Sequence, residues 1–460
     1  MPSAPPSKRG LSWWLSAGYG LGSLGTGMFS TVPGLLLLYF MTDTLGIPAG
    51  MAGLAIFVPK MWDVVIDPVL GSLSDHTHTR WGRRRPWMLA GGVTLPLAFL
   101  GMFVVPEFSA PALTATYVSV LFVLAATCFS FFQVPYVAMP AEITEDPHQR
   151  TVVVGWRIAF MTLGILLAGA LAPVLITAGG GGRPGYQLMA GVLSVACFLS
   201  LVGSFLATAG VHFTEHVASE LPLREQLRLA LGNRPFFMLL LAGILQLTGV
   251  ATVLAAVPYF AHYVLGGGEN TVTLLFVSLV LPAMLTMPLW VKISKRVGKI
   301  RAYQMSVTLF AVMDLSLLTG SSHHLNLLYL QVAMMGAAYA GTQLFPFALL
   351  PDIITLDFEK TGLRREGTFT GMWTASEQIG MAVGAGLAGV VLSLFGFVES
   401  TTGQVTVQPD SALLGIRLTF GLVPALLLLL SVPVLGKIRM AVLSRPVPAP
   451  DDLLSTGVLP

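Results

Sequence analysis

Two aspartates stand four residues apart within an apolar stretch of this 460-residue chain. In the run KMWDVVIDP, Asp63 and Asp67 would share one face of a helix near the middle of the apolar segment 47–75. A charged carboxylate inside a lipid bilayer costs at least about 2.5 kcal/mol, so a pair of them needs a positive partner. Because hard cations prefer oxygen ligands, the spacing predicts a site that binds Na⁺ or a proton reversibly.

Two basic side chains offer a different explanation for the aspartate pair. Lys60 stands one turn before Asp63, and Arg157 lies in the apolar segment 151–178. Either could neutralise the carboxylates permanently, or could take the place of the cation while none is bound. We predict a gating role for Lys60 and a role in substrate binding or gating for Arg157.

Glutamines recur near the middle of four separate apolar segments, at Gln133, Gln246, Gln343 and Gln378. An amide without a hydrogen-bond partner is costly there, so each of them either bonds a neighbouring helix or faces a wet cavity. Amides that line a cavity can donate to and accept from a polar solute. We predict a substrate site formed by Gln133, Arg157, Gln343, Trp373 and Gln378.

The loop DHTHTRWGRRRP is dense in charges that could bridge helices at one face of a membrane. We predict that it closes that face in one conformational state, through Asp75, Arg80, Arg83, Arg84 and Arg85. The alternative is that the positive charges only keep the loop on the cytoplasmic side.

Composition places the chain in a membrane. Only 10% of its residues are charged, against roughly 25% in a soluble globular protein, and 54% are hydrophobic, with a mean hydropathy of +0.78. The net charge is only +3, and the positive residues are spread over several short loops and form no single patch. Nucleic acid is therefore a poor candidate for a partner. Cys128 and Cys197 lie in apolar segments without metal-binding spacing, and no disulfide is expected.

Long apolar runs divide the chain into spans, since a bilayer core of about 30 Å needs roughly 20 helical residues. The sequence predicts an all-α membrane protein with twelve spans, at 12–41, 47–75, 87–105, 112–142, 151–178, 187–209, 235–263, 270–292, 302–320, 324–352, 367–397 and 410–436. A polar interruption at 210–234 separates two sets of six. It predicts an N-terminal bundle at 1–209, a cytoplasmic linker, a C-terminal bundle at 235–440 and a disordered cytoplasmic tail at 441–460.

The distribution of positive residues predicts the orientation of these spans. With a cytoplasmic N-terminus, Arg183 is the one Lys or Arg of the 25 that falls in an outer loop, while Lys60, Arg157 and Arg417 fall within spans. One missed helix would invert every later loop, so the asymmetry supports the span count. We expect a multi-pass protein of the cell (inner) membrane with both termini in the cytoplasm.

The two halves also echo each other. The loop after the second span and the loop KISKRVGKIR after the eighth are both basic and contain Gly. A duplicated six-helix unit is the plan of many secondary transporters, whose two bundles rock around a site near the membrane midplane.

Several stretches carry a family resemblance. They are YFMTDTLGI at 39–47, WDVVIDPVLGSLSDHTHTRWGRRRPWML at 62–89, VPYVAMPAEI at 134–143 and DIITLDFEKTGLRREGTFTGMW at 352–373. Together they resemble the glycoside-pentoside-hexuronide:cation symporter family of the major facilitator superfamily, which is typified by melibiose permease. The resemblance spans both halves and implies the major facilitator fold, with two six-helix bundles.

The resemblance also implies roles for particular residues. It implies a cation site built from Asp63 and Asp67 with a hydroxyl from Ser130, which would be a metal site if the ion is Na⁺. Family members use Na⁺, Li⁺ or H⁺ to take up sugars, and Arg157 matches an arginine near that site. The sugar-binding carboxylates of melibiose permease are replaced here by Gly27 and Gln133.

A further departure concerns the eleventh span, where the lysine typical of the family is replaced by Gln378, preceded by Glu377. These departures leave the cation motif in place but argue against a galactoside as the substrate.

The predicted function is a cation-coupled secondary symporter, using Na⁺ or H⁺, for a small polar solute such as a sugar or glycoside. Ion and solute would favour the same occluded state. The alternatives are a cation-coupled transporter of an amphipathic lipid such as a lysophospholipid, and a membrane sensor that transports nothing. We expect that the protein is not an enzyme, because no soluble segment contains a nucleophile elbow, an HExxH motif or a phosphate-binding Gly loop. A monomer in the lipid bilayer is expected, with no cofactor besides the coupling ion.

Overall fold

The computed structural model describes residues 12–75, 77, 79–144, 146–209, 228, 230–319, 324–361, 366–401 and 407–443. Nearly all of these residues are helical, and the one β-bridge among them pairs Leu45 with Thr401. The prediction of an all-α protein is therefore confirmed.

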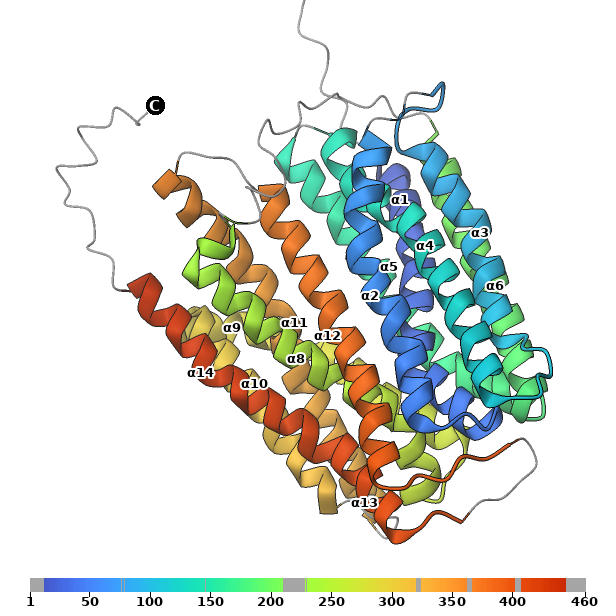
Figure 1. Ribbon diagram of the computed structural model, residues 1–460. Helices are drawn as coiled ribbons and strands as arrows, with labels where there is room; N and C mark the ends of the chain where they lie inside the picture. The colour runs from blue at the N-terminus through green and yellow to red at the C-terminus, as the bar shows by residue number, and fades with distance from the viewer. Residues whose placement is uncertain are drawn as a thin grey trace, which may run out of the picture.

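The first half of the chain forms six long helices (Figure 1). They are α1 (Trp13–Val32), which continues through the π-helical turns η1 (Pro33–Leu37) and η2 (Phe40–Thr44), α2 (Ala49–Asp75), α3 (Arg85–Phe103), α4 (Pro111–Ile143), α5 (Pro147–Ala178) and α6 (Gly182–Ala207).

The second half also forms six helical segments within the described residues. They are α8 (Arg234–Tyr259) with the π-helical turn η3 (Phe260–Val264), α9 (Glu269–Val297), α10 (Lys299–Ser316) with the 3₁₀ turn η4 (Leu317–Thr319), α11 (Leu325–Thr361), α12 (Glu366–Leu394), and α13 (Asp410–Arg417), which runs through η6 (Leu418–Leu422) into α14 (Val423–Leu443). Each predicted span overlaps one of these twelve segments.

Ten of the segments in the described residues are long and apolar enough to cross a membrane. The other two are α1 and α10. Helix α1 is rich in Gly, Ser and Thr, which lower its hydropathy, and α10 carries Lys299, Arg301 and Asp314 within its 18 residues. The structure is thus consistent with twelve spans, two of which are more polar than the rest.

The helices pack as two groups (Figure 1). Within α1–α6, α1 contacts α5 and α6, and α4 contacts α2 and α3; within α8–α14, α8 contacts α12 and α14, and α11 contacts α9 and α10. We call these groups the N-terminal bundle and the C-terminal bundle. They meet mainly where α2 packs on α12 and α5 packs on α9. The predicted linker at 210–234 lies mostly outside the described residues.

The two bundles are joined at the end of the molecule where α13 lies, and in Figure 1 they spread apart toward the opposite end. The hydroxyls of Thr42 and Tyr259 are 2.6 Å apart, and the Ser400 hydroxyl donates to the carbonyl of Asp43 at 2.9 Å. A Cβ at Gly389 would stand 2.6 Å from the carbonyl oxygen of Ala49, so glycine is what allows α12 to approach α2 here. This end of the interface is closed by direct contacts.

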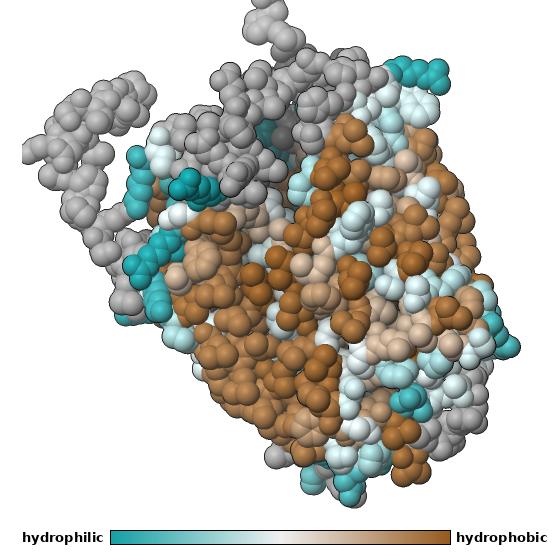
Figure 2. Space-filling model, in the orientation of Figure 1, coloured by the Kyte–Doolittle hydropathy of each residue, from teal (hydrophilic) through white to brown (hydrophobic). Residues whose placement is uncertain are grey.

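The surface fits a lipid environment. Figure 2 shows a broad apolar area over both bundles, with hydrophilic residues gathered toward the two ends. Large aliphatic side chains face outward on several helices, and Leu285 is 71% exposed. A soluble protein rarely exposes so large an apolar area, whereas a bilayer core requires it.

Candidate functional site

Asp63 and Asp67 both lie in α2, as the sequence predicts, and their spacing places them on one face of the helix. Asp63 is 1% exposed and Asp67 is half-buried. Pro68 follows directly and lacks the amide hydrogen that would otherwise bond the carbonyl of Val64 one turn earlier.

Lys60 is the nearest positive group to this pair. Its ammonium is 3.6 Å from Oδ2 of Asp63 and lies 5.6 Å from the centre of the Phe122 ring. The other oxygen of Asp63, Oδ1, is buried and has no hydrogen-bond partner within the described part of the chain. Lys60 therefore compensates Asp63 only in part, which leaves room for a second positive group.

Ser130 on α4 brings a hydroxyl to the same place. It is 1% exposed and lies beside Asp67, yet its Oγ makes no well-formed hydrogen bond in the described residues. Two carboxylates and a hydroxyl with unsatisfied oxygens suit Na⁺ or a proton, because hard cations take oxygen ligands. Asp63, Asp67 and Ser130 form what we call the cation site.

The three donors of the cation site are all oxygens. Soft transition metals prefer nitrogen and sulfur ligands, whereas Na⁺ takes oxygens. The residues present fit an ion such as Na⁺, held by oxygens alone.

Arg157 on α5 does not serve as the permanent partner of the aspartates. Within the described residues it makes no ion pair with either of them, and its guanidinium lies 6.0 Å from the centre of the Tyr136 ring. Its Nε is buried without a hydrogen-bond partner. Arg157 instead lies close enough to Glu377, across the interface, to act on it electrostatically.

Gln133 lies on α4 one turn after Ser130, and its Oε1 is buried without a partner among the described residues. Gln133 and Arg157 thus both have unsatisfied polar atoms within the N-terminal bundle. An amide oxygen can accept a hydrogen bond from a solute hydroxyl, and a guanidinium nitrogen can donate one.

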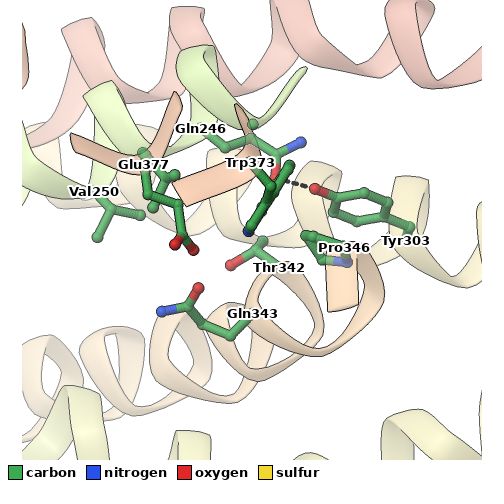
Figure 3. A pocket seen from close by; sticks show the side chains of 10 residues that line it. Gln246, Val250, Tyr303, Thr342, Gln343, Pro346, Trp373 and Glu377 are labelled. Atoms are coloured by element: carbon green, nitrogen blue, oxygen red, sulfur yellow. Dashed lines mark hydrogen bonds between the residues drawn. The ribbon is translucent and has the colours of Figure 1, made fainter. Parts of the chain in front are cut away.

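A small pocket opens in the C-terminal bundle (Figure 3). Helices α8, α10, α11 and α12 line it, and its polar side chains are Gln246, Tyr303, Thr342, Gln343, Trp373 and Glu377. Gln343 and Trp373 belong to the predicted substrate site. Gln378 does not line this pocket, although its neighbour Glu377 does. We call it the C-terminal pocket.

Gln246 serves as a structural contact between helices. Its amide nitrogen donates to the hydroxyl of Ser431 at 3.0 Å, and its Oε1 accepts from the hydroxyl of Tyr303 at 2.7 Å. It therefore holds α8, α10 and α14 together. Gln343, by contrast, donates to the hydroxyl of Tyr339 one turn away on its own helix, and its Oε1 accepts no hydrogen bond in the described residues.

Glu377 and Thr342 are pocket residues that the sequence interpretation did not select. The signal for Glu377 was present, because an acidic residue inside the predicted span 367–397 is as costly as Asp63 in its own span. Thr342 carries no such signal, because a threonine hydroxyl in a membrane helix often bonds its own backbone.

The basic loop between α2 and α3 is tied to its own bundle. A terminal nitrogen of Arg85 donates to the carbonyl of Phe205 on α6 at 3.0 Å, and the guanidinium lies 4.4 Å from the centre of the Phe205 ring. Arg84 is buried, Arg83 is half-buried, and Arg80 lies over the ring of Trp81. The side chain of Asp75 lies outside the described residues. The predicted latch between the bundles therefore stays a prediction.

Residues 18–438 match the MFS/sugar transport protein family. A putative glycoside/cation symporter of Escherichia coli is 27% identical over 93% of this chain and 93% of its own, and a putative sulfoquinovose importer of Salmonella typhimurium is 28% identical over 95% and 91%. A solved bacterial homologue of the human lysosomal transporter Spinster, inward-facing and unoccupied, has a TM-score of 0.69 at 13% identity, covering 95% of this chain and 98% of that one. The similarity to the solved Spinster homologue shows that this chain has the same fold as that transporter.

Proposed function

Since the chain belongs to the MFS/sugar transport protein family, we propose that it is a cation-coupled symporter that carries a small sugar or glycoside across the cell membrane. The observation that carries the coupling is the cation site. Asp63 and Ser130 are almost fully buried and keep unsatisfied oxygens inside a membrane helix bundle, within the described part of the chain. Such groups persist where a mobile ligand satisfies them.

The cation would bind to the free oxygens of Asp63, Asp67 and Ser130 and loosen the contact between Asp63 and Lys60. The sugar would lie between the bundles, against Gln133 and Arg157 on one side and Gln343, Trp373 and Gln378 on the other. Each ligand would then favour the state in which the bundles close around both. Such mutual preference makes the binding of one ligand raise the affinity for the other.

The geometry of the interface fits alternating access. Hydrogen bonds and glycine contacts join the bundles at the end where α13 lies. In this proposal the protein lies in the inner membrane and both of its termini lie in the cytoplasm. The end where α13 lies then faces outward, and the site opens inward. Rocking of the N-terminal bundle, 1–209, against the C-terminal bundle, 235–440, would expose the site to each side in turn in a monomer.

Two observations favour a sugar over an amphipathic lipid. The C-terminal pocket is small, and its lining includes hydroxyl, amide and carboxylate groups. The named relatives are a putative glycoside symporter and a putative sulfoquinovose importer. We propose transport without a catalytic step and with no cofactor besides the ion.

The test is gradient-driven uptake in liposomes. A thermal-shift screen of sugars and glycosides, with and without Na⁺ and at two pH values, first identifies a ligand and its ion. In the double variant Asp63→Asn with Asp67→Asn, accumulation should fall by at least about a hundredfold, while the folded protein remains in the membrane. Asp410→Asn, an exposed aspartate at the start of α13, is the matched control. Unchanged accumulation in the double variant would exclude this mechanism.

A further inference from the structure

Glu377 is a half-buried carboxyl group in the C-terminal bundle that the cation site does not use. It lies on α12, in a segment apolar enough to span a membrane. Of the ten residues that line the C-terminal pocket, Glu377 is the only one with a carboxylate or a basic side chain. Figure 3 shows its carboxylate directed into the same space as the side chains of Thr342 and Gln343 and the indole nitrogen of Trp373.

The hydrogen bonds already made around this pocket leave mostly acceptors free. The hydroxyl of Thr342 donates to the carbonyl of Tyr339 at 2.8 Å, so its lone pairs face the pocket. Gln343 uses its amide nitrogen on the hydroxyl of Tyr339, which leaves its carbonyl oxygen free to accept. The carboxylate of Glu377 adds two more acceptor oxygens. A ligand that satisfies these groups must bring several donors.

Trp373 supplies the complementary group. Its side chain is 2% exposed, and its Nε1 lies near the carboxylate of Glu377 but makes no well-formed hydrogen bond among the described residues. An unpaired buried N–H is costly, so this donor also points to a bound acceptor such as a ring or hydroxyl oxygen. A buried N–H donor beside a set of acceptors suits a sugar, whose ring and hydroxyl oxygens accept while its hydroxyls donate.

Charge decides which sugars such a pocket accepts. When Glu377 is ionised, each hydroxyl that donates to it forms a charge-assisted hydrogen bond, which is about twice as strong as a neutral one. A carboxylate on the ligand would instead meet a like charge in a site of low dielectric, where repulsion is strong. Arg157 offsets part of the negative charge, but it approaches from α5, on the other side of the interface.

We propose that Glu377 determines the substrate class: it accepts hydrogen bonds from the hydroxyls of a neutral sugar in the C-terminal pocket and excludes anionic sugars such as hexuronides. This inference rests on the proposed function, because it assigns a role within the same transport site. It makes Glu377 a specificity-determining residue that touches the substrate, and separates it from Asp63 and Asp67, which hold the ion.

The experiment compares matched ligands on purified full-length protein in the presence of the coupling ion. The hexoside that binds best in the thermal-shift screen is paired with its uronate, in which a carboxylate replaces the C6 hydroxymethyl group. The wild type should bind the neutral ligand at least about tenfold more tightly. Glu377→Gln should weaken neutral binding by about tenfold and reduce the preference over the uronate by at least the same factor, because it loses one charge-assisted bond and the repulsion.

Two further variants make the result decisive. Glu377→Asp keeps the charge, so it should retain the preference for the neutral ligand even where its affinity is lower. Glu107→Gln removes an exposed carboxylate outside the pocket, on the loop between α3 and α4, and should change neither affinity. Each variant is compared at equal thermal stability without ligand.

The outcomes separate this inference from the proposed function. If no sugar or glycoside stabilises the wild type, the proposed function fails. If a neutral sugar binds but the wild type prefers its uronate, the assignment of Glu377 is overturned and the symporter remains. The same holds if Glu377→Gln leaves the ratio of the two affinities unchanged, or abolishes only the ion dependence of binding, since that would make Glu377 a proton site.

Discussion

The cation site in one bundle and the Gln246 contact in the other treat their buried polar groups in opposite ways. In the cation site of the N-terminal bundle, Asp63 and Ser130 keep oxygens without hydrogen-bond partners in the described residues. In the C-terminal bundle, Gln246 has both ends of its amide bonded, to Ser431 and Tyr303. Both sets are polar side chains inside apolar helices. What differs is whether the fold itself supplies the partner.

This difference separates groups that bind a ligand from groups that fix the packing of helices. Leaving a buried polar atom unpaired costs about 1–3 kcal/mol, so such an atom needs an explanation, and a bound ligand is one. A fully bonded amide contributes stability and cannot bind a solute without breaking its own bonds. Gln343 and Trp373 lie between these extremes, since each retains one free group facing the pocket.

The largest expected effect on the comparison between the cation site and the Gln246 contact comes from a substitution of Lys60. In Lys60→Met the carboxylate of Asp63 loses its ion-pair partner, and breaking a buried pair costs about 3 kcal/mol of stability in the absence of the ion. The ammonium would also no longer compete for Asp63. We therefore expect the Na⁺ or Li⁺ concentration that gives half of the maximal thermal shift to fall by about tenfold.

Lys295→Met is the control for this prediction, because Lys295 is an exposed lysine in the last turn of α9. It should leave both the stability and the ion affinity unchanged. An ion affinity that weakens in Lys60→Met would mean that Lys60 supports the ion instead of competing with it. The cation site would then resemble the bonded amides of the C-terminal bundle.

A smaller effect is expected at Gln246. Gln246→Leu leaves the buried hydroxyls of Tyr303 and Ser431 without their partner, which should lower the free energy of unfolding by about 2 kcal/mol. Denaturation in detergent measures the loss. Ser431→Ala removes only one of the two bonds and should cost about half as much. Sugar affinity should not change; a loss of affinity at full stability would place Gln246 in the substrate site.

Much of the fold could be predicted because each span carries its own signal. A long apolar run, charges at its ends and the side on which the basic loops fall are all local features of the sequence. The pair Asp63 and Asp67 is also local, since the period of one helix sets their common face. The family, the all-α class and the overlap of every predicted span with a helical segment are confirmed.

The contacts between helices could not be predicted in the same way. Nothing near Gln246 in the sequence shows that Tyr303 and Ser431 would satisfy it, while Gln343 would keep a free oxygen. Arg157 could not be assigned to Glu377 instead of the aspartates, because that depends on how α5 faces α12. Glu377 and Gln378 illustrate the same limit, because neighbouring side chains on a helix point about 100° apart, and only Glu377 lines the C-terminal pocket.

The smallest effect separates a ligand-binding amide from a structural one. Gln343→Ala removes an acceptor from the C-terminal pocket, so sugar affinity should weaken by about fivefold, which corresponds to one hydrogen bond of about 1 kcal/mol. Stability should fall less than in Gln246→Leu, because only the bond to Tyr339 is lost. Gln187→Ala, at an exposed glutamine on α6, controls for the substitution itself. If Gln343→Ala costs as much stability as Gln246→Leu and leaves affinity intact, both glutamines are packing contacts, and the substrate must lie nearer to Gln133 and Arg157.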